Sequence, residues 1–238
     1  GSVRFDQLTN QIGVLVLAGP NSRELLNRVS GSDFSNDAFK WLSGRWVDIG
    51  LAPALAIRMN FVGELGWELH HPVEYQNHIF DAVMEAGADL GIKPFGIRAM
   101  DAMRLEKSYK LVGREMSIEY AALESGLDRF VHLNKGEFKG RQGLTEWQQR
   151  GFGNTFVTMI VHDVKDADVL GNNPIYSNGD LVGRATSGGF GYRLNESMAL
   201  AMVKPEVSAV GTKLTIEILC ETFTATICEE SPFDPKNE

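Results

Sequence analysis

Cysteine is scarce in this chain, with only Cys220 and Cys228 among its 238 residues. Two cysteines do not make a disulfide framework, so we expect reduced thiols and a reducing compartment. The expected location is the cytoplasm, or the mitochondrial matrix in a eukaryote. Long hydrophobic runs are missing too, since no segment approaches the roughly 18 consecutive apolar residues of a membrane helix. We therefore expect no membrane association.

Positive charge is also low: the chain has 23 Lys and Arg residues and 31 Asp and Glu residues, which gives a formal net charge of -8. Nucleic-acid binding needs a basic surface, so we expect no nucleic-acid partner. The sequence contains no phosphate-binding GxGxxG or GxxxxGK[ST] element and no GxSxG nucleophile motif. Its histidines lack the spacing of metal ligands, so no metal site is expected. His70 and His71 are adjacent on an expected strand and should point to opposite faces.

The first part of the chain alternates between strand and helix patterns. The apolar run 13–18 predicts a buried strand, and the segment 46–59 predicts one or two more. Asn21 or Ser22 is positioned to cap a helix, with Glu24 completing a capping box. Apolar spacing predicts further helices from Tyr75 to about residue 87 and over 98–109. This order predicts an α+β layer, with helices on one face of a largely antiparallel sheet.

The second part has a different character, with short β-rich runs separated by turn signals. The runs cover 155–161, 180–185, 197–203, 213–218 and 221–228. The turn signals include Gly171 to Pro174, Ser177 to Asp180 and Gly188-Gly189. Such punctuation predicts a small β-barrel or sandwich of about 85 residues. We place a domain boundary near residue 150, which gives domains 1–150 and 151–238.

The segment from Phe61 to His70 is the first candidate site. Its glycines, Gly63 and Gly66, allow a sharp turn and close approach of a ligand to the backbone. Glu64 and Glu68 lie on or beside that loop, and a carboxylate accepts paired hydrogen bonds from a guanidinium or a pterin edge. A β-hairpin with solvated glutamates fits the same spacing, so the pattern leaves both interpretations open.

The segment 95–106 is the second candidate. Arg98 lies near a helix start, where the macrodipole disfavours a positive charge, so an arginine there is explained if it faces an anion. An ordinary surface arginine is an equal alternative. Arg104 and Glu106 are interpreted as structural residues that pair with neighbouring groups.

Several motifs occur in one order along essentially the whole chain. They are Leu17-Ala18-Gly19-Pro20, Phe61 to Glu68, Gly96 to Asp101, Arg104 to Tyr109, Glu124 to Leu127, Phe138 to Arg141, Gly183 to Gly189 and Ala199 to Val203. In this set the chain resembles the glycine-cleavage T-protein (aminomethyltransferase) superfamily. It is most similar to the folate-binding part of dimethylglycine and sarcosine dehydrogenases.

The resemblance implies a ferredoxin-like, three-lobed folate-binding fold followed by a small C-terminal β-barrel, with tetrahydrofolate as cofactor. It assigns the pterin contact to Glu68 and the outer part of the folate to Arg98. Phe61, Trp67 and Tyr109 would help to wall the pocket. Phe61 stands where the family commonly has Tyr, so one hydroxyl is lost there. Trp67 has an alternative, because strand neighbours alternate faces and it would then point into the core.

The resemblance also implies a reaction: transfer of a one-carbon unit from a methylated amine to tetrahydrofolate, giving 5,10-methylenetetrahydrofolate. In the dehydrogenase-like case an upstream FAD domain would first oxidise dimethylglycine or sarcosine. The family's catalytic aspartate lies upstream of Leu17, and Asp6 is too near to be its counterpart, so this chain alone is expected to be inactive. The alternatives are a demethylase that makes 5-methyltetrahydrofolate, a non-catalytic folate-binding protein that supports cofactor assembly, and an interaction module whose folate site has decayed.

Overall fold

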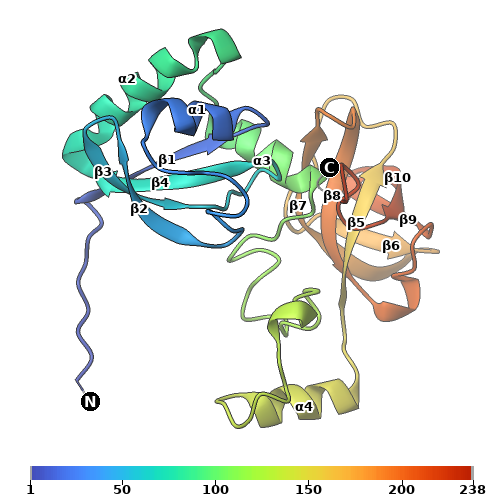
Figure 1. The fold of residues 1–238 in the computed structure, drawn as a ribbon. Coiled ribbons are helices and arrows are strands. Elements are labelled where there is room, and N and C mark those ends of the chain that lie inside the picture. Colours follow the sequence, from blue (N-terminus) through green and yellow to red (C-terminus); the bar gives the residue numbers. More distant parts are fainter. Residues whose placement is uncertain (1, 237–238) are drawn as a thin grey trace. The chain divides into compact units, whose positions relative to one another are not determined.

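The chain forms two compact units, shown as a ribbon in Figure 1. The computed structural model describes residues 2–236. Unit 1 extends to Gly96 and unit 2 begins at Ile97. Unit 1 combines helices with a four-stranded sheet, and unit 2 contains a closed six-stranded barrel. The predicted α+β class with a small β-barrel is therefore confirmed.

The sheet of unit 1 is antiparallel throughout. Its strands are β1 (Ile12–Ala18), β2 (Gly44–Ile49), β3 (Ala52–Ile57) and β4 (Gly66–Pro72). They lie in the order β1-β4-β3-β2, so β4 pairs with β1 on one side and β3 on the other. This order puts the glycine-rich candidate segment into the middle of the sheet.

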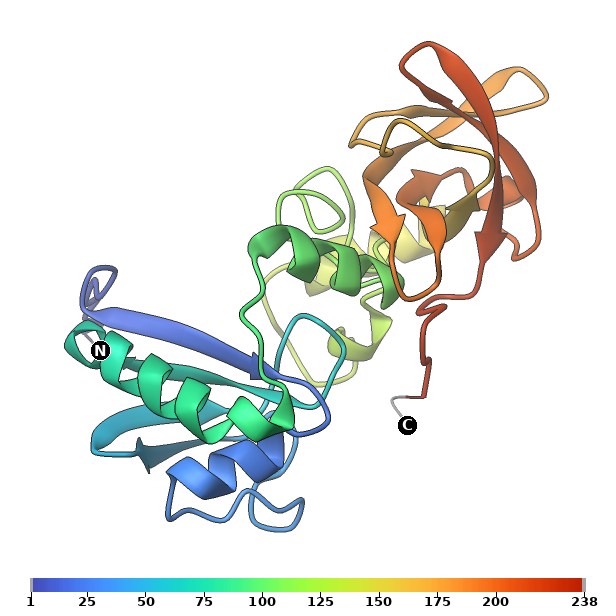
Figure 2. The same cartoon turned by 90° about the horizontal axis from the view of Figure 1, so that it is seen from above.

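Two helices cover one face of this sheet, as Figure 1 and Figure 2 show from two directions. They are α1 (Ser22–Val29) and α2 (Gln76–Ala86), with short 3-10 turns at Val73–Tyr75 and Ala88–Leu90. Leu25 and Leu26 of α1 and Ile79 of α2 are buried against the sheet. The strands contribute Trp67 and Leu69 to the same core. Burial of this apolar surface is the main stabilising term for unit 1.

The predicted capping box at α1 is wrong. Asn21 is the N-cap residue, but its side chain makes no capping hydrogen bond. Ser22 instead donates its hydroxyl to the carbonyls of Gly19 and Leu65, at 2.7 and 3.0 Å. Glu24 pairs with Arg28 one turn later on the same helix, at 2.6 Å. The Ser22 hydroxyl therefore attaches the start of α1 to the loop before β4.

The barrel of unit 2 closes in the order β10-β5-β8-β7-β6-β9. Its strands are β5 (Thr155–Val161), β6 (Pro174–Ser177), β7 (Asp180–Gly191), β8 (Glu196–Val203), β9 (Lys213–Ile218) and β10 (Glu221–Cys228). Closure leaves no open sheet edge. A 3-10 turn (Pro205–Val207) precedes β9. Both cysteines are free thiols.

Gly188-Gly189 was predicted as a turn, and that prediction is wrong because both residues lie inside β7. The glycine is needed for packing: a Cβ at Gly188 would lie 2.4 Å from the Cβ of Val169. Val169 is fully buried in the barrel core. Because Gly188 has no Cβ, the segment that contains Val169 can approach β7 closely.

The segment before the barrel contains α3 (Ile97–Glu106), a 3-10 turn (Asp128–Phe130) and α4 (Arg141–Arg150). Helix α4 was not predicted, and it contains no fully buried residue. No helix within residues 2–236 is both long enough and apolar enough to cross a membrane.

Candidate functional site

Glu68 lies near the middle of β4, on the face of the sheet that the helices do not cover. Its direct partners are Val16 on β1 and Ile57 on β3. Partners in an antiparallel pair share a face, so these two side chains flank the carboxylate. Val16 is 38% exposed and Ile57 is half-buried. The carboxylate is therefore flanked by apolar side chains that remain accessible.

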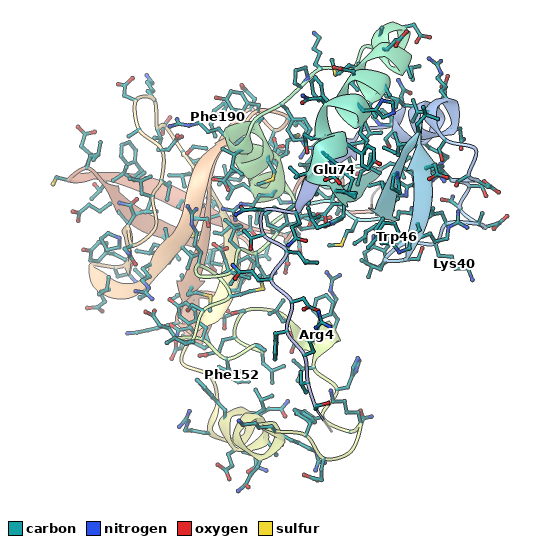
Figure 3. All side chains as sticks on the ribbon, turned by 90° about the vertical axis from the view of Figure 1, so that its left-hand side faces the viewer. Arg4, Lys40, Trp46, Glu74, Phe152 and Phe190 are labelled. Carbon is teal, nitrogen blue, oxygen red and sulfur yellow. The ribbon has the colours of Figure 1, made fainter. Side chains whose placement is uncertain are left out.

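The same face continues along the strands. His70, Val14 and Leu55 are register partners, and Leu55 is paired in turn with Trp46 on β2. Trp46, labelled in Figure 3, is 70% exposed. We call this set the outer face: Val14, Val16, Trp46, Leu55, Ile57, Glu68 and His70. These side chains are apolar except for Glu68 and His70; the exposed Asp48 of β2, which pairs with Pro53, lies on the same face but outside this set.

His70 fixes one oxygen of the Glu68 carboxylate. The His70 Nε2 lies 3.0 Å from the Glu68 Oε2, and the two side chains are 29% and 26% exposed. His71 is fully buried on the other face and bonds to Gln76 at 2.9 Å. The prediction that the two histidines face opposite sides is confirmed. Sequence reasoning missed His70 as a neighbour of Glu68, although a spacing of two residues on a strand places side chains on one face.

The loop before β4 is built by Asn60. Its side-chain amide donates to the Glu64 carbonyl at 2.7 Å, and its side-chain oxygen accepts the Val62 N–H at 2.9 Å. Gly63 adopts a φ of 72°, which agrees with its expected role in a sharp turn. Gly66 serves a different purpose, because a Cβ there would lie 2.6 Å from the Leu17 carbonyl oxygen. The close approach at Gly66 is thus made by β1.

Trp67 lies in the core of unit 1. It is fully buried, and its ring makes edge contacts with Phe34 and Phe39 at centroid distances of 5.6 and 6.1 Å. Of the two alternatives for Trp67 the structure thus shows the core position, since alternation turns it away from the outer face that carries Glu68. Phe61 is half-buried in the loop before β4.

In unit 2, Arg98 is the second residue of α3 and is exposed. Its guanidinium makes no hydrogen bond or ion pair with any residue between 2 and 236 that the structure describes. A cation in the first helical turn gains nothing from the macrodipole. Arg98 is therefore available for an external anion.

Tyr109 follows the end of α3 and is half-buried. Arg104 holds its backbone: the Tyr109 N–H donates to the Arg104 carbonyl at 2.9 Å, and Arg104 Nη1 donates to the Tyr109 carbonyl at 3.0 Å. Burial raises the pKa of the Tyr109 phenol; the charge of Asp234 adds to this shift and that of Arg129 opposes it. The phenol thus stays protonated at neutral pH as a hydrogen-bond donor.

Arg104 and Glu106 pair with neighbouring groups, as the structural interpretation of these two residues expected. Arg104 is fully buried and donates to Asp101 at 2.7 Å. Glu106 is 1% exposed and accepts the backbone N–H groups of Arg193 and Leu194, at 2.6 and 3.1 Å. Its other oxygen pairs with the Arg193 guanidinium at 2.5 Å. These bonds join α3 to the β7–β8 turn.

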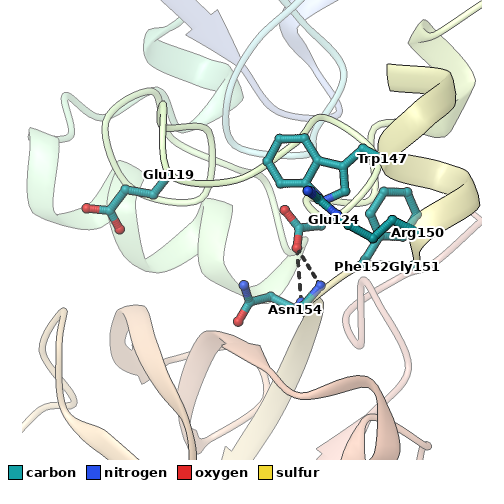
Figure 4. A pocket seen from close by; sticks show the side chains of 8 residues that line it. Glu119, Glu124, Trp147, Arg150, Gly151, Phe152 and Asn154 are labelled. Carbon is teal, nitrogen blue, oxygen red and sulfur yellow. Dashed lines mark hydrogen bonds between the residues drawn. The ribbon is translucent and has the colours of Figure 1, made fainter. Parts of the chain in front are cut away.

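A separate open pocket of about 410 Å³ lies beside the end of α4 (Figure 4). Its lining residues are Glu119, Glu124, Trp147, Arg150, Gly151, Phe152, Gly153 and Asn154. Glu124 accepts the N–H groups of Gly153 and Asn154 at 3.1 and 3.0 Å. The five predicted folate contacts are all outside this lining. Within the described residues, no cluster of three or more His, Cys, Asp or Glu side chains has the arrangement of a metal site.

Comparison with known proteins places these features in a family. Residues 1–135 match the GCVT N-terminal domain, and residues 155–234 match the glycine cleavage T-protein C-terminal barrel domain. The chain belongs to the glycine cleavage T-protein family, whose aminomethyltransferases are folate-dependent.

The relatives include two kinds of enzyme. Mitochondrial dimethylglycine dehydrogenase of Homo sapiens is 38% identical over 96% of this chain and 26% of its own length. Aminomethyltransferase of Halothermothrix orenii is 30% identical over 92% of this chain and 60% of its own length. The crystal structure of the glycine cleavage system aminomethyltransferase T from Bartonella henselae has a TM-score of 0.82 at 20% identity. The match extends over 94% of this chain and 60% of the Bartonella henselae chain. The chain thus spans about a quarter of the dehydrogenase and three fifths of the transferases.

Proposed function

We propose that this chain supplies tetrahydrofolate contacts to a one-carbon transferase, and that Glu68 binds the pterin ring. The observation that carries the proposal is the outer face of unit 1. Its acid is 26% exposed and lies between Val16 and Ile57 on the neighbouring strands. The pterin of tetrahydrofolate has a planar pyrimidine half, whose faces can pack against aliphatic side chains, and an edge with paired N–H donors. The ring fits beside the two aliphatic side chains while its edge donates to the carboxylate.

Unit 2 is assigned its own contacts in this proposal. Arg98 is exposed in the first turn of α3, and we assign it the carboxylates of the benzoyl-glutamate part. Tyr109 offers a half-buried ring and a protonated phenol. Phe61 is assigned an apolar wall contact in unit 1. Trp67 is withdrawn as a wall residue because it is fully buried in the core.

The proposed reaction transfers a one-carbon unit from a methylated amine to tetrahydrofolate and yields 5,10-methylenetetrahydrofolate. The catalytic aspartate and an FAD domain that oxidises dimethylglycine or sarcosine are assigned to upstream sequence. This chain would supply folate contacts without turning over substrate. We keep 1–150 and 151–238 as the proposed domains, and the cytoplasm or the mitochondrial matrix as the proposed location.

The test compares 5-formyltetrahydrofolate binding by the chain with that of Glu68→Gln. Loss of a charge-assisted contact of about 1.5–3 kcal/mol weakens binding by about tenfold to a hundredfold. Glu74→Gln is the matched control, because Glu74 is an exposed glutamate in the turn after β4, labelled in Figure 3. Equal affinities of the unchanged chain and Glu68→Gln would contradict the assignment.

Product analysis with an upstream-extended protein separates the reaction classes. Formation of 5,10-methylenetetrahydrofolate from dimethylglycine or sarcosine supports the proposed reaction. Formation of 5-methyltetrahydrofolate from a methylated sulfonium or O-methyl donor would instead indicate a demethylase. Folate binding without turnover of any such donor would indicate a non-catalytic binding protein.

A further inference from the structure

The segment that follows the barrel returns to the end of α3. We call residues 229–235 the strap. It begins directly after β10, which ends at Cys228. It makes hydrogen bonds to the segment 106–110, which is more than a hundred residues earlier in the sequence. Both partners belong to unit 2.

The strap satisfies backbone groups at the carboxyl end of α3. The Phe233 N–H donates to the Glu106 carbonyl at 3.1 Å, and the Ser231 hydroxyl donates to the Lys107 carbonyl at 2.7 Å. The Ser231 N–H donates to the Ser108 hydroxyl at 2.9 Å. The last carbonyls of a helix have no partner within the helix. The strap therefore acts as a C-terminal cap that comes from a distant part of the chain.

Charged groups add to this attachment. Lys107 is 2% exposed, and its ammonium donates to the Asp234 carbonyl at 2.5 Å. Lys110 pairs with Glu230 at 2.5 Å, and its side chain is 8% exposed. The strap thus supplies an oxygen partner to each of two lysine side chains that are almost fully buried. Buried charges without such partners are strongly disfavoured.

Phe233 stabilises the attachment from the other side. Its ring lies 4.0 Å from the guanidinium carbon of Arg193. The same guanidinium pairs with Glu106, the last residue of α3. A cation over an aromatic ring is attracted by the ring's quadrupole. The strap thereby contacts both the helix end and the arginine that anchors it.

We propose that the strap is a positioning element for the folate contacts of unit 2, because it fixes the backbone from Glu106 to Lys110 and hence Tyr109. This inference rests on the proposed folate function and extends it to a segment outside the candidate site. Tyr109 lies between two residues that the strap contacts: Ser108 accepts a hydrogen bond from Ser231, and Lys110 forms an ion pair with Glu230. The raised pKa of the Tyr109 phenol, to which Asp234 contributes, is consistent with this closeness.

The test uses the chain shortened to end at Glu229, together with Phe233→Ala and Phe233→Tyr. Binding of 5-formyltetrahydrofolate and amide hydrogen exchange are measured on each protein. We expect the shortened chain to exchange faster over residues 104–110 and to bind folate about tenfold more weakly, which corresponds to about 1.4 kcal/mol. Phe233→Ala is expected to show the same changes to a smaller extent. Phe233→Tyr should keep the exchange rates and the folate affinity of the unchanged chain, because it keeps the ring beneath Arg193.

Two controls separate positioning from loss of fold. Exchange in β8 should be unchanged in every variant, and Lys236→Ala, an exposed change beyond the strap, should behave as the unchanged chain. Unchanged exchange over 104–110 in the shortened chain would overturn the strap's holding role. Faster exchange with unchanged folate affinity would overturn its effect on the ligand. Absence of folate binding by the unchanged chain would overturn the proposed folate function, and with it the strap's effect on the ligand. The exchange result would still decide whether the strap holds α3.

Discussion

Replacing Arg104 with methionine should destabilise unit 2 strongly. The Arg104 and Glu115 side chains are both fully buried, with 3.6 Å between Arg104 Nη1 and Glu115 Oε2. Removing one member of a buried ion pair leaves an uncompensated charge and costs about 3–5 kcal/mol. Glu115 keeps hydrogen bonds from the Leu111 N–H and from the hydroxyls of Thr186 and Ser187. These donors moderate the loss, so we expect the lower end, about 3 kcal/mol.

A urea titration read by pulsed hydrogen exchange measures this loss in unit 2 alone. Peptides from β8 report on unit 2 and peptides from β4 report on unit 1. With a urea dependence of about 2 kcal/mol per molar, Arg104→Met should lower the midpoint of the β8 peptides by about 1.5 M. The midpoint of the β4 peptides should not change, which makes unit 1 an internal control.

The double variant Arg104→Met/Glu115→Gln tests the reason for this loss. It removes both charges, so it should be more stable than the sum of the single losses predicts, by about 1–2 kcal/mol. Purely additive losses would refute the argument that the buried pair is coupled. So would a shift below about 0.5 M for Arg104→Met, because this corresponds to only about 1 kcal/mol.

Three smaller predictions concern unit 2. Gly188→Ala should lower its free energy of unfolding by more than about 2 kcal/mol, since the new Cβ would overlap Val169; an unchanged urea midpoint would contradict this. Iodoacetamide at pH 8 should label the exposed Cys220 and leave Cys228 unmodified, because burial raises the pKa of the Cys228 thiol to about 11. Equal labelling of the two cysteines, measured by mass spectrometry, would contradict this prediction. Glu124→Gln should cost about 2 kcal/mol in a denaturant titration, because an amide cannot accept all the backbone N–H groups that the carboxylate accepts; full stability would disprove this.

Much of the fold could be predicted from local pattern. The runs that became β1, β5, β8, β9 and β10 are apolar or alternating over strand length, and the structure has strands there. Two elements were missed for physical reasons. Strand β6 has only four residues and begins with a proline, and α4 lacks the buried stripe that makes a helix recognisable. Gly188 was misread because a glycine marks close packing as readily as a turn.

The candidate site was only partly predictable. Strand alternation already required Glu68 and Trp67 to face opposite sides, but it did not say which faced the core. The long-range register decides this: Leu17 stands opposite Trp67, and Val16 opposite Glu68. Pairing between strands depends on contacts across the whole unit, which no local pattern contains. The contact of the strap with α3 is of the same kind.

A calorimetric titration with the two halves of the ligand shows whether Glu68 binds the pterin ring. The chain, Glu68→Gln and Arg98→Ala are each titrated with 5-formyltetrahydrofolate, with a reduced pterin and with p-aminobenzoyl-glutamate. We expect Glu68→Gln to weaken binding of the pterin and of the whole folate about tenfold or more, and to leave binding of p-aminobenzoyl-glutamate unchanged. Arg98→Ala should show the opposite selectivity between the two halves. Equal pterin affinities of the unchanged chain and Glu68→Gln would show that Glu68 does not bind the pterin ring.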